Sequence, residues 1–298
     1  MQKEDFSVFA SCHIIRRIKN YGFEANAEDL LHQVWEIYDR FIILEDDLEL
    51  SPNYLEYINK CLSAYEGDKD IVAVCGYSYP VDWIKSQGAT AIKQNYNAAA
   101  WGRAFWKSKR ALYKDYISSG QLLRDVDKMN FNKLHEKMID AALCEYIPAA
   151  MCPLKRLNKL MYFPCDISMR AYLAVADKYV ISPVISKVRN YGFDGSGVYC
   201  QSIDIEKAGN NARTYNYGKQ PIDENPSFDL VLDTNECITE NRDRLNSFDV
   251  RTCGEMRRTR VYLWLLSHYN ISTGKVIAAI LLPWDVLKRL WAKIMHVR

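Results

Sequence analysis

Three consecutive acids, Glu45, Asp46 and Asp47, are the side chains whose types and spacing could most clearly do chemistry. They follow an apolar run at residues 41–44, the pattern of a strand buried on both faces. Carboxylates at the C-terminal end of such a strand lie where open α/β sheets bind ligands. Adjacent like charges are costly unless a cation joins them, so the acids indicate a divalent-metal site for a diphosphate. The alternative is a solvated strand end, or a partner for a helix dipole.

Hydrophobic periodicity predicts the elements that would position these acids. Apolar residues at helical spacing predict a helix over residues 25–38. Ser51 and Pro52 are typical of an N-cap and first turn, which predicts a helix over 51–65. Residues 71–75 form a second buried apolar run. This order of elements predicts an α/β fold with a mostly parallel, mixed sheet flanked by helices.

The rest of the chain is assigned from the same signals. We expect further regular structure in three places: a strand within residues 6–17, helices over 121–147, and a helix within 163–180 leading into a strand at 179–183. Residues 77–110 are rich in aromatic side chains and are expected to be irregular. Residues 204–250 are polar and are expected to be weakly structured.

The composition is that of an ordinary globular protein, and a net charge of +2 gives no sign of nucleic-acid binding. The nine cysteines are odd in number and form no C-x-x-C pair, so we expect reduced, mostly buried thiols in a cytosolic protein. We expect no signal peptide, and no apolar run reaches the roughly 20 residues of a membrane span. Most of the 20 tyrosines and 7 tryptophans are expected in the core.

The C-terminal residues have a different character. Residues 257–298 contain eight Lys or Arg and one acid, Asp285. Near the end, an apolar helix face that includes Leu287 and Trp291 opposes a basic one. This pattern favours a helix that lies in a membrane interface, so residues 276–298 are predicted to contact a membrane surface. The alternative is a helix docked on the protein's own core.

The acids and their surroundings carry a resemblance to a known family. The segment FIILEDDLELSPNYLEYIN resembles the metal-site segment of GT-A-fold glycosyltransferases. It resembles in particular the N-acetylglucosaminyltransferase that begins complex N-glycan branching and a large set of bacterial sugar transferases. The resemblance makes the triplet a variant DxD motif, in which Asp47 holds the Mn²⁺ or Mg²⁺ of the metal–nucleotide-sugar complex. Glu45 and Asp46 would then orient the donor.

Two further segments are similar to the same family, in the same order. Residues 100–106 resemble its W-G-x-x-x-W segment, which implies that Trp101, Gly102 and Trp106 line the acceptor side; core packing is the alternative for both tryptophans. FPCDISMR resembles the segment that carries the catalytic base, which gives Asp166 that role; a helix N-cap is the alternative, and one residue can be both. The family usually has an aromatic residue where Cys165 stands.

A fourth segment, RNYGFDGSGVYC, resembles the loop that covers the donor. Its glycines, Gly192, Gly195 and Gly197, would contact the donor and give the loop freedom to close. Tyr199 and Cys200 stand where the family often has a Ser, His or Asn, so no further metal ligand is assigned there.

The resemblance implies a domain organisation. Residues 1–203 would form a GT-A-like, Rossmann-like catalytic domain, residues 204–255 a polar extension, and residues 256–298 a basic amphipathic helical tail. Only 44 residues precede Glu45, fewer than the family uses, so the first βαβα units are expected to be missing and a sheet edge exposed. A fragment or shortened reading frame, a second chain or oligomer that completes the sheet, and a degenerate homologue are the explanations left open.

The function implied is metal-dependent, inverting sugar transfer from a nucleotide-diphosphate donor, of the UDP-sugar class, to a hydroxyl of a glycan or lipid-linked glycan. The product would be a surface polysaccharide such as capsule or lipopolysaccharide, made at the inner face of the plasma membrane. Two alternatives remain: a non-catalytic homologue that binds a sugar or a partner, and a nucleotidyltransferase or phosphatase that uses the same acids. A nucleotidyltransferase or phosphatase would need a second acidic cluster or a phosphate loop, and the sequence has neither.

Overall fold

The computed structural model describes residues 7, 9–96, 98–129, 131–150, 166–192, 221–233, 237–248, 253–269 and 271–281. The chain divides into two compact units, Met1–Asp39 and Arg40–Arg298. In the first unit, helix α1 (Phe23–Ile37) confirms the helix predicted over 25–38. The strand predicted within 6–17 is wrong, because the described residues of that stretch form no strand and Ile14 is exposed. Isolated apolar residues without a partner strand cannot form a ladder.

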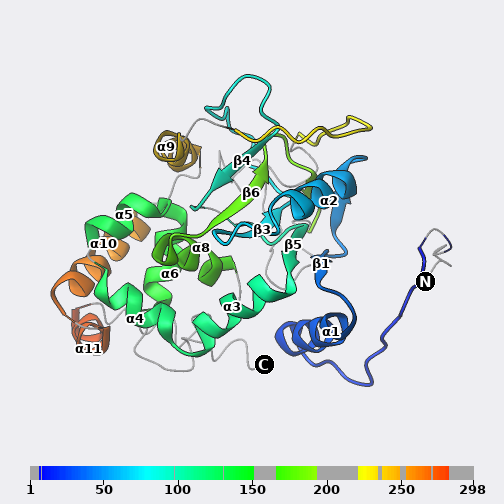
Figure 1. The fold of residues 1–298 in the computed structure, drawn as a ribbon. Coiled ribbons are helices and arrows are strands. Elements are labelled where there is room, and N and C mark those ends of the chain that lie inside the picture. The colour runs from blue at the N-terminus through cyan, green and yellow to red at the C-terminus, as the bar shows by residue number, and fades with distance from the viewer. Residues whose placement is uncertain are drawn as a thin grey trace. The chain divides into compact units, whose positions relative to one another are not determined.

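The second unit is built on a five-stranded sheet with the order β1-β5-β3-β6-β4 (Figure 1). Its strands are β1 (Arg40–Ile43), β3 (Ile71–Cys75), β4 (Ala91–Gln94), β5 (Arg103–Trp106) and β6 (Tyr179–Pro183). The α/β class is confirmed, but the mostly parallel sheet is wrong. Only β3 and β6 pair in parallel, whereas β1–β5, β3–β5 and β4–β6 are antiparallel.

The observed sheet differs from the predicted one because of residues 77–110, which were expected to be irregular. They contain β4 and β5, each of four residues, and both return against the direction of their neighbours. Strands this short, in a stretch crowded with aromatic side chains, leave no alternation long enough to detect. A second, two-stranded ribbon pairs β2 (Leu48–Leu50) with β7 (Val188–Asn190).

The two outer strands of the sheet are covered differently. Beyond β4, Leu232 forms a bridge to Ala91, and the amide of Asp233 donates to the Ala91 carbonyl at 2.8 Å. Beyond β1, the described residues supply no paired strand. The expectation that residues 41–44 are buried on both faces is also wrong, because only Phe41 is buried and Leu44 is 46% exposed.

Within the second unit, helices lie beside the sheet, and several of them gather together at the lower left in the view of Figure 1. Both α2 (Tyr54–Ala64) and α3 (Lys107–Ser118) pack against β3 and β5. The helices expected over 121–147 and within 163–180 are confirmed. The remaining helices are α4 (Gln121–Lys128), α5 (Phe131–Lys137), α6 (Asp140–Ala150), α8 (Asp166–Ala176), α9 (Ile238–Phe248), α10 (Cys253–His268) and α11 (Ile271–Leu281).

Three sequence expectations about the helices need correction. The N-cap of α2 is Asn53 rather than Ser51, whose carbonyl accepts from the Tyr54 amide at 3.0 Å. Residues 204–250 were expected to be weakly structured, yet α9 lies within them. The proposed boundary at residues 255 and 256 falls inside α10, which packs against α6. None of the described helices is both long and apolar enough to cross a membrane.

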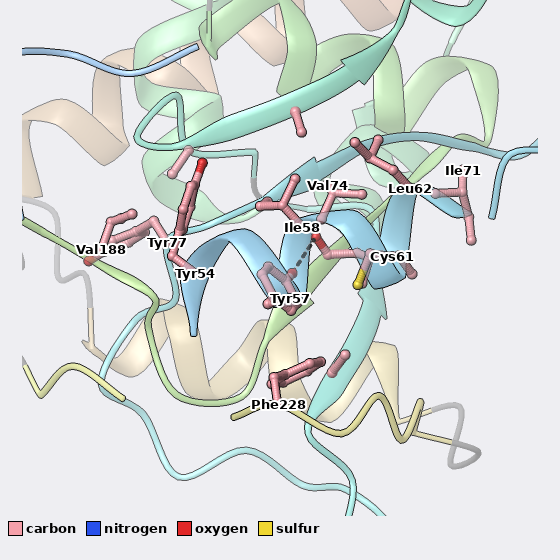
Figure 2. Close-up of a cluster of buried hydrophobic side chains, with 14 of the residues drawn as sticks. Tyr54, Tyr57, Ile58, Cys61, Leu62, Ile71, Val74, Tyr77, Val188 and Phe228 are labelled. Carbon is pink, nitrogen blue, oxygen red and sulfur yellow. Dashed lines mark hydrogen bonds between the residues drawn. The ribbon is translucent and has the colours of Figure 1, made fainter. Parts of the chain in front are cut away.

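The core between α2 and the sheet is aromatic and tightly closed (Figure 2). Tyr57 is fully buried, and its hydroxyl donates to the Cys75 carbonyl at 2.9 Å, so the centre of α2 is tied to the end of β3. The Tyr57 ring meets Phe228 edge-to-face at 5.0 Å. Among the described cysteines, Cys61, Cys75 and Cys144 are buried as expected, whereas Cys12 is exposed.

A buried ion pair fastens residues 221–233 to this core. The Lys187 ammonium is 1% exposed and pairs with the carboxylate of Asp223. It also donates to the side-chain oxygen of Asn53 at 2.9 Å, and the Asn53 amide donates to Asp223 at 3.1 Å. The start of α2, the approach to β7 and a segment far along the chain therefore share one desolvated polar network.

Removal of one partner from this network should be costly. We expect Lys187→Met to lower the free energy of unfolding by about 3–5 kcal/mol, because Asp223 is left as an uncompensated, largely buried charge. The matched control is Lys178→Met, which removes an exposed pair with Asp70 at 2.9 Å and should cost under about 1 kcal/mol. Urea denaturation measures both, and similar small losses for the two variants would contradict the assignment.

Candidate functional site

The acidic triplet lies in the connection between β1 and the β2–β7 ribbon. Leu48 pairs with Asn190 in that ribbon, so the register brings Asp47 opposite Tyr191. The Tyr191 amide donates to the Asp47 carbonyl at 2.9 Å. Across the ribbon, Arg189 forms an ion pair with Glu49 at 2.8 Å. The ribbon thus fixes the predicted metal ligand against the start of the predicted donor loop.

Gly192 touches the carboxylate of Asp47. A Cβ built on Gly192 would overlap Asp47 Oδ2 and would lie 2.9 Å from its carboxyl carbon, inside any real contact distance. The Gly192 amide donates to the Asn190 side chain at 2.7 Å, which holds the turn in place. Residue 192 therefore has to be glycine if Asp47 keeps this position.

Arg103 brings a positive charge to the same place. It pairs with Ile43 on one side and with Cys75 on the other, so it lies where β1 and β3 both end. Its guanidinium forms an ion pair at 3.5 Å with Asp166, the first residue of α8. It also donates to the Ala98 carbonyl at 3.2 Å, and its Nε is buried with no hydrogen-bond partner among the described residues.

The Glu45 carboxyl group lies close enough to these charged side chains for them to shift its pKa. Burial, followed by the neighbouring carboxylates of Asp47 and Asp166, raises the pKa of Glu45 to about 7, and Arg103 opposes the rise. Asp47 and Asp166 are 119 positions apart in the sequence (166 − 47), yet both act on the same carboxyl group. The structure therefore brings together the acids that the sequence placed in two separate segments.

This donor set is suited to a hard divalent cation. Oxygen ligands from carboxylates are what Mg²⁺ and Mn²⁺ prefer, and Mg²⁺ commonly takes one or two carboxylates while substrate phosphates complete its shell. Within the described part of the chain, no three acids, histidines or cysteines converge as a complete protein cage would need. A cation held by Asp47 would therefore need further ligands from outside the described residues.

Comparison with known proteins adds no family assignment. No protein-family model matches the sequence, and no curated protein is significantly similar to it.

The predicted acceptor residues differ in accessibility. Trp101 is half-buried and meets Tyr77 edge-to-face at 4.8 Å, so part of its ring can be reached. Trp106 is 2% exposed, and its indole N–H donates to the Leu62 carbonyl at 3.1 Å. Trp106 therefore belongs to the core, the alternative that the sequence left open, and it cannot contact an acceptor from this position.

Gly102 has a packing role that its sequence motif did not indicate. Its φ of +61° lies in the left-handed region, and a Cβ there would come 2.7 Å from Val188 and 3.1 Å from the Tyr54 ring. A Cβ on Gly76 would in turn lie 2.6 Å from the Gly102 carbonyl. The two glycines allow the backbone just after β3 and the backbone just before β5 to lie in close contact.

Several predicted residues lie outside the described part of the chain: Gly195, Gly197, Cys165, Tyr199, Cys200 and the tail beyond residue 281. Sequence reasoning, in turn, gave Arg103 no role. The signal available for it was a lone basic residue at the start of the otherwise apolar strand RAFW. A charge in such a position needs a buried counter-charge.

The raised pKa of Glu45 has a consequence for stability. Because the folded state holds this proton more tightly than the unfolded state, the free energy of unfolding should fall as pH rises from about 4.5 to about 7. Glu45→Gln removes this titration. With divalent ions chelated, we expect the variant to gain roughly 1–3 kcal/mol over wild type between pH 5 and 8.

Urea denaturation at four pH values in that interval measures the difference. Glu66→Gln is the control, because its carboxylate is exposed and pairs only with the half-exposed Arg40. A stability difference between Glu45→Gln and wild type that stays constant with pH would contradict the assignment of the buried proton to Glu45.

Proposed function

We propose that this chain is a metal-dependent, inverting glycosyltransferase that moves a sugar from a nucleotide-diphosphate donor, of the UDP-sugar class, to a hydroxyl of a glycan acceptor. One observation carries the proposal. Glu45 and Asp47, Asp166, and Gly192 come from three separate segments that resemble the same family, and they meet at one site with Arg103. If each segment resembled the family only by chance, there would be no reason for residues from all three segments to meet at one site.

Asp166 is positioned to act as the general base. Its side chain is 38% exposed, so an acceptor hydroxyl can reach the carboxylate while Arg103 fixes the opposite edge. In the proposed reaction, the hydroxyl oxygen attacks the anomeric carbon as its proton passes to Asp166. The bond from that carbon to the diphosphate breaks on the opposite side, which inverts the anomeric configuration. Holding the reactants in line supplies much of the rate.

The acids of the triplet would act on the donor. Asp47 would hold the cation, and a bound Mg²⁺ or Mn²⁺ neutralises the charge that develops on the departing nucleotide diphosphate. Glu45 and Asp46 would face the nucleotide and orient it. Gly192, which is in contact with Asp47, would let the backbone after β7 come close to the donor and exclude water, since hydrolysis is the competing reaction.

Substitution of the two aspartates should separate their roles. We expect Asp166→Asn to lower metal-dependent hydrolysis of a UDP-sugar at least about hundredfold, because the general base is lost, while donor binding is kept. Asp47→Asn should instead abolish the Mn²⁺ dependence of donor binding. Titration calorimetry with Mn²⁺ and a panel of UDP-sugars, together with a nucleotide-release assay, measures both.

Asp229→Asn is the matched control for this experiment, because its carboxylate is 97% exposed and remote from the acidic triplet in sequence. Wild-type protein that neither binds nor hydrolyses any UDP-sugar in the presence of Mn²⁺ would contradict the proposed function. Equal losses of hydrolysis and donor binding in Asp166→Asn, Asp47→Asn and Asp229→Asn would contradict the separate roles given to the first two aspartates.

A non-catalytic homologue that binds a sugar or a partner is the second candidate. The observation that favours it is the outer edge of β1, which has no paired strand within the described residues. Such an edge offers hydrogen-bonding groups to another chain or to a further part of the same protein. In that case this chain alone would bind a nucleotide sugar weakly, and tight, metal-dependent binding in the titration would exclude the idea.

We also propose that the protein works at a membrane surface. Along α10, Arg257, Arg260 and Trp264 are exposed at successive helical turns, and on α11 Val276 and Ile280 are 62% and 72% exposed. A basic and aromatic stripe beside exposed apolar side chains suits an interface rich in anionic lipid. Lipid-linked glycans for surface polysaccharides would be met at such an interface, on the inner face of the plasma membrane.

Charge reversal tests this location. We expect the double variant Arg257→Glu and Arg260→Glu to reduce sedimentation with phosphatidylglycerol vesicles at least about tenfold, because each basic residue near such a surface contributes about 1 kcal/mol. Lys69→Glu with Lys107→Glu is the control, since both lysines are exposed on other elements. Equal binding by both double variants, or none by wild type, would contradict the assignment.

A further inference from the structure

An open hollow lies between the loop after β3 and one face of α9. Its volume is about 610 Å³, which is within the range of small-molecule sites. Six of its lining residues define its chemistry: Pro80, Asp82, Glu240, Asp243, Ser247 and Phe248. None of them was assigned a role from the sequence.

The walls of this hollow are fixed rather than loosely apposed. The side chain of Asn241 is 4% exposed; it accepts from the Ile84 amide at 2.8 Å and donates to the Ile84 carbonyl at 2.9 Å. Leu245 is fully buried on the same helix. At the rim, Arg244 forms an ion pair with Asp82 at 3.0 Å. These contacts lock α9 onto the loop, so the hollow keeps its shape.

The lining has the chemistry that a neutral sugar needs. Phe248 and Pro80 present apolar surface, on which the C–H face of a pyranose ring can stack. The carboxylates of Asp82, Glu240 and Asp243 accept hydrogen bonds from several hydroxyl groups at once. Asp82 pairs with Arg244 and Asp243 pairs with Arg242, so the three acids stand against two arginines. The remaining excess of negative charge disfavours an anionic ligand, so phosphorylated or acidic sugars are poor candidates.

A row of aromatic rings joins the hollow to the acidic site. Phe248 meets Tyr79 edge-to-face at 5.9 Å, Tyr79 meets Tyr77 at 5.1 Å, and Tyr77 meets Trp101 at 4.8 Å. Tyr77 is buried, so a ligand would touch Trp101, Tyr79 and Phe248, which are half-buried. Trp101 lies two positions before Arg103, whose guanidinium contacts Asp166.

We propose that this hollow is an acceptor subsite that holds a sugar unit distant from the reacting hydroxyl. The occupant is a neutral oligosaccharide, because one pyranose ring does not span the three ring contacts between Trp101 and Phe248. The inference rests on the proposed transferase function, and it names the acceptor of that function as an extended, uncharged glycan chain rather than a monosaccharide.

Glycan binding by the full chain tests the subsite independently of turnover. The probe is a printed array of neutral and anionic oligosaccharides, and titration calorimetry then follows with the neutral oligosaccharide that gives the strongest signal. Ser247→Trp fills the hollow from an exposed position without removing a packed side chain, and Phe248→Ala removes the stacking surface. Tyr38→Ala, at an exposed tyrosine outside the hollow, is the matched control.

We expect wild type and Tyr38→Ala to bind the same neutral oligosaccharides. Ser247→Trp and Phe248→Ala should weaken that binding at least tenfold, while Mn²⁺-dependent binding of a UDP-sugar stays unchanged in both. Absence of glycan binding by wild type, preference for anionic glycans, or unchanged affinity in Ser247→Trp would overturn the proposal. Absence of UDP-sugar binding by wild type would instead count against the transferase function. Failure of the subsite proposal and failure of the proposed function can therefore be told apart.

Discussion

Burial of acidic side chains at the end of β1 is the constraint on which the candidate site depends. Burial raises the pKa of Glu45 to about 7, and the neighbouring carboxylates of Asp47 and Asp166 add to the rise. Arg103 opposes that rise from inside the sheet, where it is 8% exposed. Its place between β1 and β3 depends on β5 running antiparallel to both strands. The topology of the sheet therefore places a positive charge beside the buried acids.

A second constraint comes from the β2–β7 ribbon, which sets the position of the acids relative to the segment after β7. The Leu48–Asn190 register fixes Tyr191 and Gly192 against Asp47. The buried Lys187–Asp223 pair holds the other end of β7 to the start of α2. The segment Tyr191–Gly192, which could approach a donor, is thus anchored at its base on both sides.

Sequence reasoning located the elements with long, strongly periodic patterns. Helix α1, the buried strand β3 and the acids after β1 were all predicted, because each has a local signal in composition or spacing. The strands β4 and β5 were not predicted because they are short, and the helix α9 was not predicted because it is polar; the stability of all three comes from distant partners. Ser182, for example, pairs with Ile92, and Asn241 closes onto Ile84. Arg103 was missed for the same reason, since its counter-charge lies far away in the sequence.

The contact between Gly76 and Gly102 restricts how this site can evolve. A side chain at either position would collide with the other strand's backbone or with Tyr54 and Val188. A substitution at one glycine does not relieve the crowding at the other. Substitutions in this region are therefore easier at neighbouring positions than at the glycines themselves. A change in specificity is therefore sterically easier in loops such as residues 80–86 and on α9 than at these two glycines.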